Sequence, residues 1–248
     1  MKVLVATEKP FAKVAVDGIR EVIENAGFEL ELLEKYPDKK ALLEAVKDAN
    51  ALIIRSDVID KEVFDAAKEL KIVVRAGAGY DNVDLNAATA HGVCVMNTPG
   101  QNSNAVAELV FGLLIMAMRS FYDGKAGAEL KGRKLGIHAY GNVGRNVARI
   151  AKGFGMEVYA YDPYCPKEVI NEADLLRLME DRTAFRFVTD IMPVHHEEFA
   201  ALFPGRYFST PKKMGAQTAE ANINAGIAAA RQIVAFFKEG CEKFRVNK

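Results

Sequence analysis

Short runs of apolar, often β-branched residues alternate along the first hundred residues with longer segments whose apolar positions recur every three or four residues. The first pattern predicts buried strands, and the second predicts helices with one face turned toward a core. The strands are expected at 2–6, 28–33, 51–54, 71–75 and 93–95, with helices at 12–26, 39–46, 61–67 and 84–90 between them. Regular alternation of this kind predicts an α/β fold with a mostly parallel sheet.

A long apolar helix, expected over 102–120, is followed by a second alternating region. Its strands are expected at 134–139, 157–161, 185–190 and 206–209. Its helices are expected after the turn 140–145 as far as 154, at 168–179 and at 217–238. The segment that contains His195 and His196 is expected to be a solvated loop, and we assign no metal to it because adjacent histidines in a loop do not converge on one ion without other ligands.

The charge composition argues against two classes of binding partner, nucleic acids and membrane surfaces. Lys plus Arg and Asp plus Glu number 33 each, so no excess positive charge is available for nucleic acid or an anionic membrane surface. The run Ala105–Met118 contains Glu108 and falls short of the roughly 20 residues that span a bilayer, so we expect a buried helix there. Three widely spaced cysteines fit a reducing cytoplasm, and the chain starts as a strand rather than as a signal peptide.

A strand, a glycine turn, a helix and a second strand that ends at an acid form the constellation that binds dinucleotides. Gly141 allows close approach of the backbone to a pyrophosphate, and Gly144 allows close packing of helix and strand. Asp162 lies 21 residues after Gly141 and would accept hydrogen bonds from both ribose hydroxyls, which favours NAD over NADP. Ala139 occupies the first glycine position of the motif. The predicted cofactor residues are Tyr140, Gly141, Asn142, Val143, Gly144 and Asp162; an ordinary tight turn is the alternative.

Three ordered blocks carry a resemblance to a known family. They are the segment 75–84 (RAGAGYDNVD), the segment 97–108 with Asn102 and Glu108, and the nucleotide turn. Together they resemble the D-isomer-specific 2-hydroxyacid dehydrogenases, most of all the 3-phosphoglycerate branch. The resemblance implies two Rossmann-like parallel-sheet domains. Residues 1–97 with 218–248 would form the substrate domain and 98–217 the NAD domain, with no regulatory domain after the last helix.

The resemblance also implies roles for particular residues. Arg55 and Ser56 would contact an anionic 2-hydroxy acid, and an arginine can hold a carboxylate or phosphate through two parallel hydrogen bonds. The backbone amides of Ala76 and Gly77 would cradle the substrate carboxylate, and Asn102 would face the reacting carbon. A solvated arginine and a simple glycine turn are the alternatives at these positions.

Three catalytic positions depart from the family pattern. Lys212 stands where the family histidine is expected, and it could act as the base if Lys213 and partial burial depress its pKa; a pair of surface lysines is the alternative. His195 stands where the family glutamate is expected. Pro166 stands where the family arginine is expected.

The segment after Pro166 departs further from the family pattern. Lys167–Ala173 resembles the stretch that follows the family arginine, so on the order of 60 residues, or two βαβ units, are missing and the NAD domain is truncated after Pro166. We expect the strand at 185–190 to move beside the strand containing Leu135 or Val158 and to close a reduced sheet.

The expected activity is the NAD-dependent oxidation of D-3-phosphoglycerate to 3-phosphohydroxypyruvate, the first step of L-serine biosynthesis, by a cytoplasmic homodimer. Two alternatives stay open. One is a non-catalytic remnant or binding protein derived from an internally deleted dehydrogenase, and the other is a dehydrogenase for a different 2-hydroxy acid.

Overall fold

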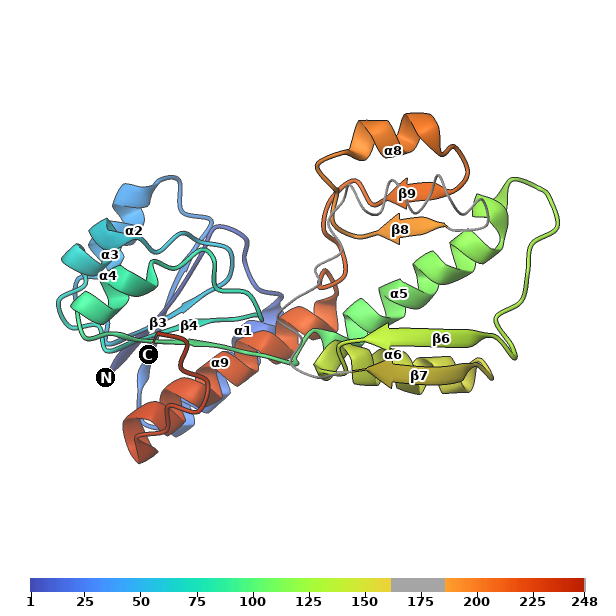
Figure 1. The fold of residues 1–248 in the computed structure, drawn as a ribbon. Helices are drawn as coiled ribbons and strands as arrows, with labels where there is room; N and C mark the ends of the chain where they lie inside the picture. Colours follow the sequence, from blue (N-terminus) through green and yellow to red (C-terminus); the bar gives the residue numbers. More distant parts are fainter. Residues whose placement is uncertain (162–185, 248) are drawn as a thin grey trace. The chain divides into compact units, whose positions relative to one another are not determined.

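The computed structural model describes residues 1–161 and 186–247 and divides the chain into two compact units (Figure 1). The first unit comprises Met1–Asn102 and Thr218–Lys248, so its last part comes from the C-terminal end of the chain. The second unit comprises Ser103–Gln217. Each unit is built from strands and helices that alternate along the chain, as the hydrophobic pattern predicts.

The first unit contains a five-stranded parallel sheet in the order β2-β1-β3-β4-β5. Its strands are β1 (Lys2–Thr7), β2 (Glu29–Glu34), β3 (Ala51–Ile54), β4 (Ile72–Arg75) and β5 (Cys94–Asn97). All four residues of the central strand β3 are buried, as expected of a parallel strand that is covered on both faces.

Helices cover both faces of this sheet (Figure 1). On one face lie α2 (Lys39–Ala45), α3 (Lys61–Ala66) and α4 (Leu85–Ala90), whose Leu42, Phe64 and Ala88 join one apolar cluster. On the other face lie α1 (Lys13–Asn25) and α9 (Ala219–Glu239), which pack against each other and contribute Ile19 and Ile233 to a second cluster. The carboxyl ends of the parallel strands therefore stand at one edge between two helical layers.

The C-terminal segment follows the outer edge of β5. Helix α9 ends at Gly240, whose φ of 65° is the left-handed conformation that commonly terminates a helix. The chain then returns, and Met96 forms an antiparallel bridge with Arg245. Asn247 is buried, and its side chain accepts a hydrogen bond from the Val95 amide at 2.8 Å and donates one to the Val93 carbonyl at 2.8 Å. These contacts form hydrogen bonds with backbone groups that an edge strand would otherwise leave unpaired.

The second unit begins with α5 (Ser103–Met118), followed by a short 3-10 helix, η1 (Ser120–Tyr122). Next come β6 (Lys134–His138), α6 (Asn142–Gly153) and β7 (Glu157–Tyr161), with β6 and β7 paired in parallel. Phe111 of α5 and Val147 of α6 share a small buried cluster. In the described residues, no helix combines the length and the apolar character needed to cross a membrane.

A separate two-stranded parallel sheet joins β8 (Phe187–Thr189) to β9 (Tyr207–Ser209). The expectation that this part of the chain pairs with the strand of Leu135 or Val158 is therefore wrong for the described residues. The physical reason lies in the side chains: the rings of Phe187, Phe199 and Tyr207 pack together with centroids 5.1 to 5.6 Å apart, and they hold β8 against β9.

The histidine segment is also different from its prediction. It forms helix α8 (His196–Leu202) rather than a loop. Phe199 is fully buried and Phe203 nearly so, while Glu197 and Glu198 occupy the first turn, where carboxylates favour a helix. The helix expected at 168–179 lies outside the described residues.

Candidate functional site

The first candidate site lies at the carboxyl ends of two neighbouring strands of the first unit. Arg55 and Ser56 follow β3, and Arg75 ends β4, where it is in register with Ile54. Ligands of open parallel sheets bind outside the carboxyl ends of the strands. Arg55, Ser56, Ala76 and Gly77 are thus brought to one edge of one sheet.

The guanidinium of Arg55 is held in a defined orientation. Its Nη1 donates to the carbonyl oxygens of Lys9 at 2.8 Å and Pro10 at 3.0 Å, and its Nη2 donates to Asn222 Oδ1 at 2.7 Å. These bonds use three of the five N–H donors of an arginine, and the other two have no acceptor among the described residues. Burial lowers the pKa of Arg55 below its usual value, although Asp57 opposes this effect, and the group stays charged at any physiological pH.

Asp57 anchors the loop that carries Arg55. It is only 4% exposed, and its Oδ1 accepts hydrogen bonds from the Tyr36 hydroxyl at 2.7 Å and the Glu8 amide at 2.8 Å. Its Oδ2 accepts from the Arg55 amide at 3.2 Å. The carboxylate thereby joins the loops that follow β1, β2 and β3. Burial, followed by the contact with Asp57, raises the pKa of Tyr36 well above its usual value.

Arg75 is a site residue that sequence reasoning missed. Its Nε donates to the Arg55 carbonyl at 3.0 Å, and its Nη1 and Nη2 donate to no described residue. A Cβ at Gly77 would overlap this guanidinium, and the φ of 156° at Gly77 is a backbone conformation that residues with a side chain rarely adopt. Burial lowers the pKa of Arg75. The available signal was its place at the end of a buried strand, immediately beside the predicted Ala76–Gly77 turn.

The two amides predicted to cradle a carboxylate already have backbone partners. The Ala76 amide donates to the Ile54 carbonyl at 2.8 Å, and the Gly77 amide donates to the Arg75 carbonyl at 2.8 Å. The next amides along the chain, those of residues 78–80, donate to no described residue. The available donors of this turn therefore lie one to three residues beyond Gly77.

The remaining substrate residues make few contacts. Ser56 is exposed, and Asn102 is half-buried at the end of the first unit, immediately before α5. Neither side chain forms a hydrogen bond to the described part of the chain.

The second candidate site is the turn between β6 and α6. A Cβ on Gly144 would overlap the carbonyl oxygen of Ala139, whereas a Cβ on Gly141 would meet no atom within 4 Å. Gly141 is the N-cap of α6, and the amides of Asn142 and Val143 donate to no described residue. Close packing at one glycine and open space with available amides at the other fit the pyrophosphate of a dinucleotide.

Two further residues predicted to bind the cofactor are Tyr140 and Asp162, and the structure describes only the first of them. Tyr140 lies in the turn, and its carbonyl accepts a hydrogen bond from Arg145 Nε at 3.1 Å. Asp162, predicted to hold the ribose hydroxyls, lies outside the described residues, as does Pro166.

Ala139 adopts a left-handed conformation with φ of 78°, at the position where the nucleotide motif has its first glycine. An alanine pays a steric cost of about 1 kcal/mol in this region that a glycine avoids. We therefore expect Ala139→Gly to stabilise the second unit by up to about 1 kcal/mol, measured as a higher midpoint of urea unfolding. Unchanged or lower stability would contradict the strain assigned to this residue.

Lys212 lies in the loop 210–215, and the carboxylate of Asp190 holds that loop. Asp190 accepts hydrogen bonds from the buried Thr210 hydroxyl at 2.8 Å, from the Met214 amide at 2.8 Å and from the Gly215 amide at 2.7 Å. The side chains of Lys212 and its neighbour Lys213 are exposed, so the partial burial expected of Lys212 is not present. Sequence reasoning missed Asp190 because its partners lie 20 to 25 residues away.

The two histidines point to different partners. His195 Nδ1 lies 3.3 Å from Glu198 Oε2, and His196 Nδ1 lies 2.7 Å from the Tyr207 hydroxyl. Within residues 1–161 and 186–247, no group of three or more His, Cys, Asp and Glu side chains is arranged to hold a metal ion.

Comparison with known proteins agrees with this architecture. Residues 6–247 match the D-isomer specific 2-hydroxyacid dehydrogenase catalytic domain. The chain therefore belongs to the D-isomer specific 2-hydroxyacid dehydrogenase family, which confirms the predicted family and the α/β fold with parallel sheets.

Individual relatives share about two fifths of the aligned residues. The chain is 38% identical over 171 residues to the D-3-phosphoglycerate dehydrogenase of Methanocaldococcus jannaschii, covering 63% of this chain and 32% of that protein. It is 37% identical over 153 residues to the hydroxypyruvate reductase of Thermotoga maritima, covering 56% and 50%. The chain thus spans between a third and a half of these relatives' length.

A solved structure of a relative matches the whole chain. The NAD+-bound 3-phosphoglycerate dehydrogenase of Entamoeba histolytica superimposes with a TM-score of 0.84 at 41% identity, covering 100% of this chain and 99% of that one.

Proposed function

We propose that this chain is an NAD-dependent dehydrogenase that oxidises D-3-phosphoglycerate to 3-phosphohydroxypyruvate, the first step of L-serine biosynthesis. The observation that carries the proposal is the pair of half-buried arginines, Arg55 and Arg75, at the ends of adjacent strands. The relatives named above as 3-phosphoglycerate dehydrogenases support the same substrate.

The paired arginines suit a substrate with two acidic groups. Arg55 retains two N–H donors, and both terminal nitrogens of Arg75 have no partner in the described part of the chain. Guanidinium groups bind carboxylate and phosphate through paired, charge-assisted hydrogen bonds. Because Asp57 and the Lys9–Pro10 carbonyls already orient Arg55, little side-chain entropy is lost when an anion binds.

The β6–α6 turn would hold the cofactor, with the amides of Asn142 and Val143 directed to the pyrophosphate and Gly141 allowing its approach. When bound, NAD accepts a hydride. The proposed Asp162 contact favours NAD over NADP because a carboxylate repels a 2′-phosphate.

Oxidation of a hydroxyl carbon also requires a base that takes the hydroxyl proton. We assign this role to Lys212, whose unprotonated amine would accept the proton. Asp190 would hold the loop 210–215 in place while the proton is transferred. We further propose a homodimer, because α5 is largely apolar, with Asn104 and Glu108 as its exposed polar residues, and leaves Val110 37% exposed in the single chain.

A second candidate function is a non-catalytic binding protein. It is favoured by the two-stranded size of the β6–β7 sheet in the described residues and by the exposure of Lys212. In this case the arginines of the first unit would still bind an anion without turnover.

One experiment separates these functions. The purified chain is incubated with NAD and D-3-phosphoglycerate, and NADH formation is followed by absorbance, with D-lactate and D-glycerate as competing substrates. Dehydrogenase activity predicts turnover that is greatest with D-3-phosphoglycerate and falls by about 10² or more in Lys212→Ala, since general-base catalysis typically contributes 10² to 10⁴. Lys213→Ala is the matched control and should retain activity.

The outcomes assign the function as follows. No turnover together with D-3-phosphoglycerate binding that is lost in Arg75→Gln supports the binding protein. Turnover that survives Lys212→Ala would reject the assigned base, and a preference for D-lactate would reject the phosphorylated substrate.

A further inference from the structure

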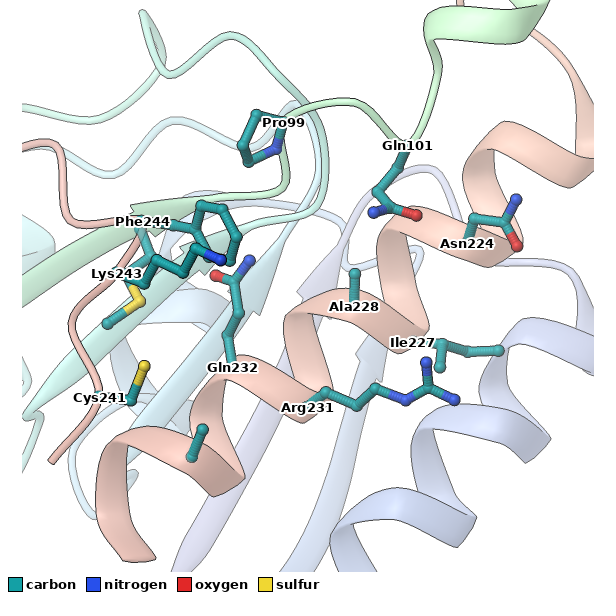
Figure 2. Close-up of a pocket in the computed structure, with 12 residues that line it drawn as sticks. Pro99, Gln101, Asn224, Ile227, Ala228, Arg231, Gln232, Cys241, Lys243 and Phe244 are labelled. Carbon is teal, nitrogen blue, oxygen red and sulfur yellow. The ribbon is translucent and has the colours of Figure 1, made fainter. Parts of the chain in front are cut away.

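A cavity of about 400 Å³ lies in the first unit, and neither Arg55 nor Arg75 is among the residues that line it (Figure 2). Three segments form its walls: the residues that follow β5, one face of α9, and the C-terminal segment after Gly240. Its polar lining comes from Gln101, Asn224, Arg231, Gln232 and Lys243, and Phe244 supplies an aromatic ring. The volume falls in the range of small-molecule sites.

The charged side chains of this cavity are all positive. Arg231 and Lys243 line it, and no lining residue carries a carboxylate. Neither cation forms an ion pair with a described residue. The nearby carboxylate of Glu242 is paired instead with Arg245 at 2.8 Å. Figure 2 shows Arg231 and Lys243 at opposite ends of the cavity wall. The cavity therefore favours an anion, and most of all one with two separated acidic groups.

A third lining residue, Gln232, has a side-chain oxygen that could accept a hydrogen bond from a ligand. Gln232 Nε2 donates to the Asn97 carbonyl at 3.0 Å, which fixes the orientation of the amide. Its Oε1 is then buried without a donor in the described part of the chain. A buried acceptor without a partner costs about 1–3 kcal/mol, which a hydroxyl or ammonium group of a ligand would recover.

We propose that this cavity is a second ligand site, which binds a small organic dianion carrying a hydroxyl or ammonium group between its two acidic ends. Arg231 and Lys243 hold the acidic ends, and Gln232 Oε1 accepts the hydrogen bond from the central group. The site does not depend on the dehydrogenase function, because none of its residues takes part in the proposed reaction.

Cys241 provides a readout confined to this cavity. It is half-buried and lines the wall, so a bound ligand should shield its thiol from iodoacetamide. Cys94 serves as an internal control: it is buried, and burial raises the pKa of its thiol to about 11, so it reacts slowly in any case. Peptide-resolved mass spectrometry follows each cysteine separately. An anion bound at Arg55 leaves the Cys241 rate unchanged.

The probes are malate, succinate and lactate at equal ionic strength and millimolar concentration. Malate has two carboxylates and a hydroxyl, succinate lacks the hydroxyl, and lactate lacks one carboxylate. We expect malate to slow Cys241 alkylation with about tenfold higher affinity than succinate, since one hydrogen bond is worth about 1.4 kcal/mol. Lactate should protect least.

Two variants test the assignment. Gln232→Leu should remove the preference for malate over succinate while leaving the affinity for succinate. Arg231→Gln alters an exposed side chain that has no hydrogen-bond or ion-pair partner among the described residues, so the fold should be retained, and both dianions should bind about tenfold more weakly. The proposal is overturned if no probe slows Cys241 alkylation, if malate and succinate protect equally in the unaltered protein, or if Arg231→Gln leaves protection unchanged.

Discussion

Replacing Gly144 by alanine is expected to destabilise the second unit by about 2–3 kcal/mol, because a Cβ there overlaps the backbone carbonyl of Ala139. The obstacle is main chain rather than a flexible side chain, so either β6 or α6 has to move. The change should appear as a lower urea midpoint of the second unit, followed by circular dichroism, with weaker NAD binding as a consequence.

Gly141→Ala is the matched control in the same turn. A Cβ at this position meets no atom within 4 Å and the φ of −73° suits alanine, so we expect a loss of stability below about 1 kcal/mol. NAD binding should nevertheless weaken, since the methyl group occupies the space proposed for the pyrophosphate. Equal destabilisation by the two substitutions would refute the close helix–strand packing assigned to Gly144.

Asp57→Ala is expected to lower the stability of the first unit by about 3 kcal/mol, because it leaves three donors without their acceptor, among them the buried Tyr36 hydroxyl. It should also weaken the binding of D-3-phosphoglycerate to the first unit, because Arg55 loses the anchor of its loop. Urea unfolding and calorimetric titration measure the two effects.

The Tyr36→Phe variant separates the contribution of the Tyr36 hydrogen bond from that of the Asp57 carboxylate. It removes one donor and keeps the carboxylate, so it should cost about 1 kcal/mol and leave anion binding largely intact.

The raised pKa of Tyr36 also makes the stability of the first unit depend on pH. The native state keeps a proton that the unfolded state loses above about pH 10, so stability should fall as the pH rises beyond that value, and Tyr36→Phe should abolish this extra loss. Anion binding that is unchanged in Asp57→Ala would refute the anchoring role of Asp57.

Elements with strong local patterns were predictable from the sequence. The boundaries of β3 (Ala51–Ile54) and β7 (Glu157–Tyr161) agree with their predictions to the residue, because a short β-branched or aromatic run between turns identifies a strand by itself. Helix α8 was missed, since it is held by contacts of Phe199 with Phe187 and Tyr207, which the local sequence pattern does not show. The pairing of β8 was also mispredicted, because a strand's sequence does not specify its neighbour.

The sequence by itself determined the alternation that makes an α/β fold, the glycine turn before α6, and the arginine after β3. Only the tertiary structure decided that Arg75 lies beside Arg55 and that Asp57 is buried and anchors the loop of Arg55. It also decided that the Ala76 and Gly77 amides are already bonded and that Lys212 is exposed. The physical reason is distance along the chain: Arg55 bonds to Asn222, 167 positions away, and Asp190 bonds to a loop 20 to 25 residues further on. Local patterns set which elements form, whereas contacts between distant residues set which side chains remain available for chemistry.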